Sequence, residues 1–364
     1  MRGCLTLWFC LWSAVAVGHE VGDTVYVVSE AGVELKSSDG VATHVSQGMP
    51  LKVLEVEGER LHLQASWDKK VAWIKTDQVA AADQADQRFS AAIEEKPTAG
   101  AYLARAQVKF ANDDRVSALE DVNAAIRLNP QSSAALNFRA WLWLHRMDYD
   151  QAIADCDAAI LLDPNLTLAY VCRGRAKYKK GRSFDAIDDF DAAIRLDPTR
   201  SNVFHNRGVA HLENRNGERA ADDFTEAIRL GADDALVYCN RGLANRRQRK
   251  YGEALSDFED SIMRDPQDAW SYANAAWIYA TCPEEKWRDG KRGVELALKA
   301  CELSQGNVTF HRETLAAAYA EAGEFDEAIE TQEAIVRKTP KSHRENYEET
   351  LRLYKKGRPY RESP

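Results

Sequence analysis

Apolar residues recur along most of the chain with the spacing of amphipathic helices, and the pattern itself repeats. The segment AIADCDAAILLDP at residues 152–164 returns as AIDDFDAAIRLDP at residues 186–198. The prolines that end these segments are 34 residues apart, and related segments end at Pro130 and Pro266 in the same register. A fixed period of this length predicts an array of stacked helix pairs, in which each unit buries its apolar face against its neighbours.

Alignment on the prolines divides the array into repeats that are each predicted to form two helices. In the first helix, apolar or small residues fall at positions 4, 8 and 11 or 12, which share one helical face. Position 8 is Ala or Gly in the first five repeats, which lets the second helix approach closely. The proline at position 32 ends the second helix, because it cannot continue the hydrogen-bond ladder. The repeats are expected at 99–132, 133–166, 167–200, 201–234, 235–268, 269–308 and 309–342.

This pattern resembles the tetratricopeptide repeat (TPR) family, since the period, the small-residue positions and the terminal proline all agree. One departure is Gly231-Ala232, where the glycine is expected to make the turn. The resemblance implies an α-solenoid over residues 99–342. We expect a capping half-repeat helix at 81–98. A polar cap helix and a tail are expected at 343–364, with residues 357–364 disordered.

Residues 19–80 have a different pattern, in which short alternating runs are separated by turn residues. Alternation of this kind predicts a small all-β barrel or sandwich. The closing run, Val71-Ala72-Trp73-Ile74, resembles the end of bacterial SH3-like domains, with Ala72 in place of a glycine. The predicted fold class is therefore mostly α, a TPR α-solenoid preceded by a small all-β SH3-like barrel. Strands are expected at 24–28, 42–45, 51–56, 60–64 and 70–74.

The first 18 residues have the pattern of a secretory signal peptide. Arg2 precedes an apolar run from Cys4 to Val17, and Ala16-Val17-Gly18 provides small residues for cleavage. The run is short for a membrane span, so we expect removal after Gly18, with an uncleaved anchor as the alternative. The mature protein is then expected to be exported, periplasmic or extracellular, and free of the membrane.

Charge and motif content argue against nucleic-acid binding and catalysis. The formal net charge is -9, and no basic stripe runs through successive repeats, as a phosphate-binding surface would require. HExxH, GxSxG and glycine-rich phosphate loops do not occur in the sequence. We therefore predict no enzyme, no cofactor and no metal site. The five cysteines after residue 18 are scattered and are expected to be buried apolar side chains.

An arginine at position 7 and an aspartate at position 23 recur together in the first five repeats. Repeats six and seven lose both members. We therefore predict that each arginine pairs with the aspartate of its own repeat, and not with a neighbour's, so that a charge-assisted bond holds the two helices together. The expected structural pairs are Arg105–Asp121, Arg139–Asp155, Arg173–Asp189, Arg207–Asp223 and Arg241–Asp257.

The resemblance further implies that the first helices line a concave groove for an extended peptide or a partner helix. Positions 2, 5, 6, 9, 12 and 13 of each first helix lie opposite its packing face. Asparagine there can bond both groups of a peptide backbone, and arginine or lysine can bind carboxylates. A solvated face with incidental asparagines is the alternative. The expected groove residues are Phe138, Trp141, Arg175, Lys179, Asn206, Asn240, Arg246 and Asn274. Trp270 and Trp277 of the sixth repeat are expected to fill the core or, alternatively, to extend this groove.

Two functions remain open from the sequence. The first is an exported, non-enzymatic scaffold that binds a partner protein or peptide in the TPR groove. The second is attachment to the cell envelope or cell wall through the SH3-like domain, with the array as an assembly arm. The acidic balance of the N-terminal segment and the amide-rich face of the array favour the first.

Overall fold

The computed structural model describes residues 24–27, 33–36, 42–45, 50–57, 60–65, 71–75 and 79–362. The predicted signal peptide at 1–18 lies outside these residues. The chain divides into two compact units: the first runs to Arg182 and includes Ala192–Arg200, and the second comprises Ser183–Asp191 and the chain from Ser201. Within the described ranges, none of the helices combines the length and the apolar character that a membrane span requires.

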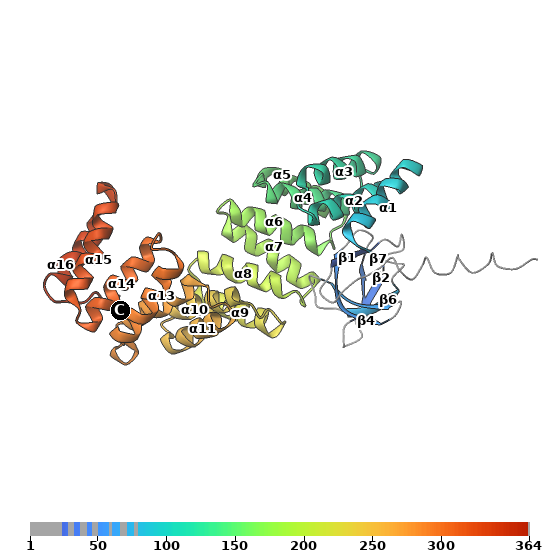
Figure 1. The fold of residues 1–364 in the computed structure, drawn as a ribbon. Helices are drawn as coiled ribbons and strands as arrows, with labels where there is room; N and C mark the ends of the chain where they lie inside the picture. Colours follow the sequence, from blue (N-terminus) through green and yellow to red (C-terminus); the bar gives the residue numbers. More distant parts are fainter. Residues whose placement is uncertain are drawn as a thin grey trace, which may run out of the picture. The chain divides into compact units, whose positions relative to one another are not determined.

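The N-terminal part of the first unit is an antiparallel sheet (Figure 1). The described strands lie in the order β3-β2-β6-β5-β4-β1-β7. The five predicted runs correspond to β1, β3, β4, β5 and β6, whereas β2 and β7 were not predicted. The SH3-like barrel stays a prediction. The strand bounds are β1 Thr24–Val27, β2 Val33–Lys36, β3 Ala42–Val45, β4 Pro50–Glu57, β5 Arg60–Ala65, β6 Val71–Lys75 and β7 Val79–Ala80.

Helix α1 (Ala82–Glu95) joins the sheet to the helical array. Its Ala85 and Phe89 are buried in one cluster with Tyr26 of β1 and with Val108 of α2. The half-repeat therefore packs against both neighbours. The other helices of the first unit are α2 Ala99–Ala111, α3 Arg115–Leu128, α4 Ser133–His145, α5 Tyr149–Leu162 and α6 Thr167–Lys179, and α7 Ser183–Leu196 is shared between the units.

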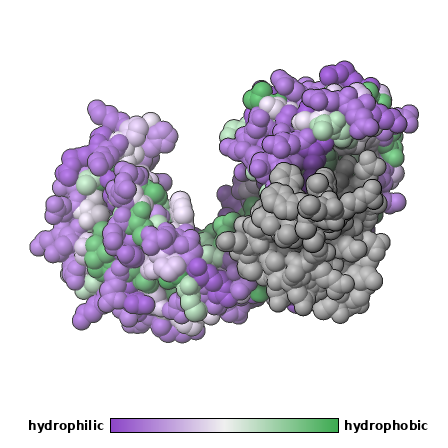
Figure 2. Space-filling model, turned by 45° about the vertical axis from the view of Figure 1, so that its right-hand side comes forward, coloured by the Kyte–Doolittle hydropathy of each residue, from purple (hydrophilic) through white to green (hydrophobic). Residues whose placement is uncertain are grey.

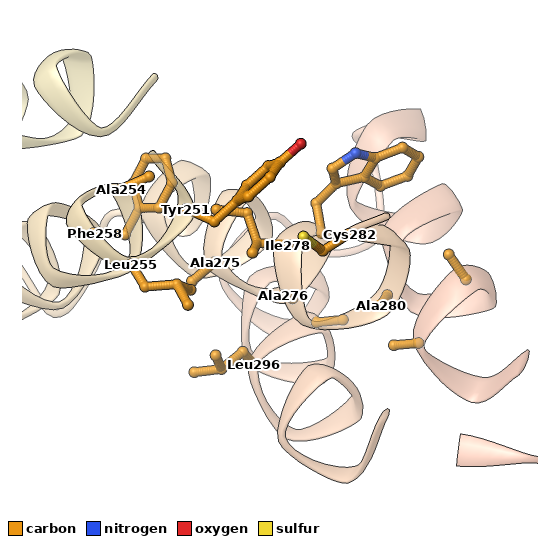
Figure 3. Packing of buried hydrophobic residues seen from close by; sticks show 14 of the residues in the cluster. Tyr251, Ala254, Leu255, Phe258, Ala275, Ala276, Ile278, Ala280, Cys282 and Leu296 are labelled. Atoms are coloured by element: carbon orange, nitrogen blue, oxygen red, sulfur yellow. The ribbon is translucent and has the colours of Figure 1, made fainter. Parts of the chain in front are cut away.

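The second unit continues the array of helix pairs (Figure 1). Its core includes Tyr251 and Phe258 of the fifth repeat and Ile278 of the sixth, which lie close together in Figure 3. The bounds are α8 Ser201–Glu213, α9 Gly217–Arg229, α10 Ala235–Arg247, α11 Tyr251–Arg264, α12 Ala269–Thr281, η2 Glu285–Trp287, α13 Gly290–Leu303, α14 Thr309–Ala322, α15 Phe325–Lys338, η3 Lys341–His343 and α16 Glu345–Tyr354.

The turn between the two helices of a repeat has the same backbone geometry in six repeats. Position 15 has a left-handed φ between 59° and 85°. The next N–H bonds the carbonyl five residues earlier, as Asp148 N does to Trp143 O at 2.9 Å, which closes the end of the first helix in a Schellman-type turn. At the end of α9, Gly231 has a φ of 93°, so the predicted glycine turn is confirmed. The position-15 residues are Asp113, Met147, Gly181, Arg215, Arg249 and Gly323.

The expectation of a disordered tail was wrong for the described residues 357–362. The chain turns back after α16 at Gly357, which has a φ of 64°. Tyr360 then packs in the core cluster that contains Trp277 of α12. The reason is that the tail contains an aromatic side chain that buries apolar surface, a contact that periodicity does not reveal.

The side chains at positions 8 and 24 of a repeat have complementary sizes in the first five repeats. The first two repeats have Ala106 and Ala140 at position 8, with the small Val122 and Cys156 at position 24. The third, fourth and fifth repeats have glycine at position 8 and phenylalanine at position 24. A Cβ placed on Gly242 would lie 2.7 Å from Cε1 of Phe258, whose side chain is fully buried. The phenylalanine therefore requires the glycine.

We expect Gly242→Ala to lower the free energy of unfolding by about 1–2 kcal/mol through overpacking. Combination with Phe258→Val, which copies the pair in the first repeat, should remove the penalty for alanine in a double-mutant cycle followed by urea unfolding. Gly100→Ala is the control, because no atom lies within 4 Å of its added Cβ. Equal costs of Gly242→Ala with Phe258 and with valine at 258 would contradict this interpretation.

Candidate functional site

The position-7 arginines lie between the two helices of a repeat and reach the position-23 aspartate. Arg139 Nε and Nη2 donate to the two carboxylate oxygens of Asp155, each at 2.7 Å. Arg105 binds both carboxylate oxygens of Asp121, and Arg207 binds both of Asp223. Arg241 Nε and Nη2 both donate to one oxygen of Asp257. Arg173 and Asp189 belong to different units, and their pairing stays a prediction.

Each of these arginines also contacts the preceding helix pair through Nη1. Arg207 Nη1 donates at 2.5 Å to Asp191 of the preceding repeat, a contact that the comparison of positions 7 and 23 did not predict. The partner always lies at position 25 of the preceding repeat or half-repeat. Each residue at that position has a side-chain oxygen that can accept a hydrogen bond. The guanidinium groups of Arg105, Arg139, Arg207 and Arg241 therefore each join three helices. The partners are Ser90 for Arg105, Asn123 for Arg139, Asp157 for Arg173, Asp191 for Arg207 and Thr225 for Arg241.

Position 11 supplies a further donor to the same aspartates. Lys109 Nζ reaches Asp121 at 2.8 Å, Trp143 Nε1 reaches Asp155 at 3.1 Å, and Asn245 Nδ2 reaches Asp257 at 2.8 Å. The bond to the aspartate raises the pKa of Arg105 and of Arg139 above the usual value. The arginine and aspartate side chains thus act as structural ties, and their hydrogen-bonding groups are used within the array.

In the first unit, the expected groove residues lie on α4 and α6. The Arg175 guanidinium carbon lies 4.8 Å from the centre of the Trp141 ring, and burial lowers the pKa of Arg175. Phe138 packs edge-on against Phe110 with 5.7 Å between ring centres. Lys179 is exposed. This part of the surface therefore combines an edge-on aromatic pair with a cation that lies over an aromatic ring.

In the second unit, the expected asparagines are not equivalent. Asn206 is half-buried, and Asn240 Nδ2 lies 3.1 Å from His205 Nε2. Asn274 is only 3% exposed, accepts from Arg246 Nη1 at 3.0 Å and donates to Trp270 O at 2.8 Å. Its amide is used within the protein, so Asn274 positions Arg246 and does not present a free amide.

A hollow of about 350 Å³ lies beside these residues, between α10 and α12. Asn240, Asn274 and Asp268 supply its polar groups, and Leu243 and Trp270 supply apolar walls. Trp270 is 52% exposed, so the expectation that it fills the core was wrong, and its ring stacks on Phe310 with 5.8 Å between ring centres. Figure 2 shows apolar side chains among a largely hydrophilic surface on the face that it presents.

The described residues outside these surfaces show no grouping of His, Cys, Asp or Glu side chains suited to a metal ion. Cys156, Cys172, Cys239 and Cys282 are buried free thiols, and Cys301 is half-buried. Burial raises the pKa of the Cys239 thiol to about 11, which keeps it protonated at neutral pH.

The comparisons with known proteins match part of the helical array. A family model described as tetratricopeptide repeat matches residues 103–166, 172–235 and 205–269. No curated protein sequence matches the chain significantly. A structure from the functional characterization of Pseudomonas aeruginosa pilF has a TM-score of 0.53 and 19% identity, and covers 60% of this chain and 96% of its own. The APC/C hetero-tetramer Cut9–Hcn1 also gives 0.53, at 18% identity, covering 63% of this chain and 45% of that one.

The family model and the solved structures support a TPR-like helical solenoid. The array therefore has the class of fold that typically serves as a non-enzymatic scaffold for protein–protein interaction, and no enzymatic family is indicated. The structural similarity, below 25% identity, concerns the fold alone.

Proposed function

We propose that the protein is an exported scaffold that binds an extended peptide of a partner protein on the concave face of its TPR array. The observation that carries the proposal is the hollow between α10 and α12. Its lining includes the Asn240 amide, the Leu243 side chain and the exposed Trp270 ring. Pockets that combine apolar walls with a few placed polar groups are typical binding sites. Export is supported by the pattern of residues 1–18.

The side chains around the hollow favour a peptide that carries a carboxylate. Asn240 can bond a backbone N–H or C=O group, and Leu243 and Trp270 can cover an apolar side chain. Arg246 is held at the edge of this surface by Asn274 at 3.0 Å. Burial lowers the pKa of Arg246, but arginine remains charged at neutral pH. A partly buried cation is stabilised by a carboxylate, so an acidic peptide fits best.

Selection of a displayed peptide library on the full chain tests this function. We expect the selected peptides to bind Trp270→Ala and Asn240→Ala at least ten times more weakly, because each change removes one side of the hollow. Phe184→Ala is the matched control, since Phe184 is also an exposed aromatic residue (74%) but does not border the hollow. Peptides that bind all three variants as tightly as the unchanged protein would contradict the proposed site.

A further inference from the structure

The C-terminal residues 360–362 lie on α12 and make specific contacts with it. Trp277 Nε1 donates to Glu362 Oε1 at 2.6 Å, and the backbone N–H of Glu362 donates to Thr281 O at 3.0 Å. The Tyr360 ring packs on Trp277, with 5.9 Å between ring centres. Arg361 Nη1 donates to Ala280 O at 3.3 Å, and its guanidinium pairs with Glu321 of α14. Side chain and backbone of the tail are thus both bound.

These contacts involve the face of the first helices that the TPR resemblance predicts to bind a partner. Trp277 and Thr281 stand at positions 9 and 13 of the sixth repeat, which belong to the concave set. Trp277 is 8% exposed beneath the tail, and Phe310 packs on it from α14. The tail therefore lies on the face of the sixth repeat that the TPR resemblance predicts to be concave, where a bound peptide would lie.

The charge of the tail matches the surface that it covers. Glu362 raises the pKa of Arg246 and so opposes the lowering that burial causes. The negative charge of Glu362 thus favours the charged form of Arg246, whose Nη1 donates to Asn274 Oδ1 at 3.0 Å. Tyr360 supplies the apolar contact two residues earlier.

We propose that the tail is an intramolecular ligand of a second peptide site, formed by α12 and α14 next to the hollow. The partner of this site is an extended peptide with an aromatic residue two positions before a carboxylate, and it competes with the tail. The inference rests on the proposed peptide-binding function of the concave face.

A free peptide must compete with the tail, because the tail is covalently linked to the protein that carries the site. A short linked segment has an effective concentration of about 1 mM at its site, so a free peptide with the same contacts binds weakly while the tail is in place. Loss of the tail contacts should expose the site to the free peptide. The two contacts that are easiest to remove are the Tyr360 ring and the Glu362 carboxylate.

The test uses the full chain and a fluorescein-labelled, amidated peptide of residues 357–362, followed by fluorescence anisotropy. We expect the variant with Tyr360→Ala and Glu362→Ala to bind this peptide at least ten times more tightly than the unchanged protein. Arg358→Ala is the matched control, because Arg358 is an exposed tail residue, and it should bind as the unchanged protein does. Peptides with alanine at position 360 or 362 should lose binding to the double variant.

Equal peptide binding by the double variant and the unchanged protein would overturn the proposal, as would no binding by a double variant with an unchanged circular dichroism spectrum. If the double variant does not fold, Glu362→Gln provides the same comparison. Concentration-dependent dimerisation of the unchanged protein, lost in the double variant, would assign the site to the tail of a second copy. Library peptides that depend on Asn240 and Trp270 would support the proposed function even if the tail site fails.

Discussion

Replacement of Asp257 by alanine should lower the free energy of unfolding by about 3 kcal/mol, because it leaves buried donors without an acceptor. Asp257 is 3% exposed and accepts from Arg241 Nε at 3.0 Å and from Arg241 Nη2 at 2.6 Å. Asn245 Nδ2 donates to its other oxygen at 2.8 Å. The Arg241 side chain keeps 21% of its exposure, so water offsets part of the loss and the effect stays at the lower end of the range for broken buried pairs.

Urea unfolding followed by circular dichroism measures this effect. Asp260→Ala is the matched control, because Asp260 pairs with Arg264 of its own helix, α11, but its side chain is 34% exposed. We expect this substitution to cost less than about 1 kcal/mol. Replacement of both partners, Arg241→Met with Asp257→Leu, should recover most of the loss, since no unpaired charge remains. A cost for Asp257→Ala no greater than that for Asp260→Ala would show that the carboxylate does not hold the helices together.

The sequence predicted only some of the hydrogen-bond partners of the position-7 arginines. Arginine and aspartate occur together at positions 7 and 23, so identity alone indicated a contact. The third contact, through Nη1, goes to position 25, where the residue changes from serine to asparagine, aspartate and threonine. These side chains share an oxygen acceptor but no residue type. A comparison by identity therefore missed the bond that connects adjacent repeats.

The candidate site shows a similar division. Helical periodicity placed Asn240, Arg246 and Asn274 on one face, but it does not distinguish a free amide from one with both groups bonded internally, as in Asn274. The tail was missed because residues 357–362 have no period and their hydrogen bonds to α12 join residues that are 81–85 positions apart in sequence. Strand β7 has two residues, too few for alternation to be recognised.

The sixth repeat departs from the 34-residue period at the segment before α13. A glycine at the start of α13 is the basis of the second large effect on stability that we expect. Gly290 begins α13, and a Cβ there would lie 2.3 Å from Ala322 N and 2.6 Å from Ala322 Cα. Backbone atoms cannot rotate away as a side chain can, so α13 and α14 would have to move apart. We therefore expect Gly290→Ala to lower the free energy of unfolding by about 3 kcal/mol, at the upper end of the range for overpacking.

Gly293→Ala is the matched control on the same helix. Its added Cβ would lie 3.3 Å from the Cβ of Ala318, and alanine favours the helix over glycine by up to about 1 kcal/mol, so the two effects should nearly cancel. Urea unfolding compares the two variants, and limited proteolysis locates the change. Because each repeat contacts only its neighbours, separation of α13 from α14 should expose the seventh repeat to protease first. Unfolding of Gly290→Ala at the same urea concentration as Gly293→Ala would mean that the two helices tolerate a wider separation than their packing indicates.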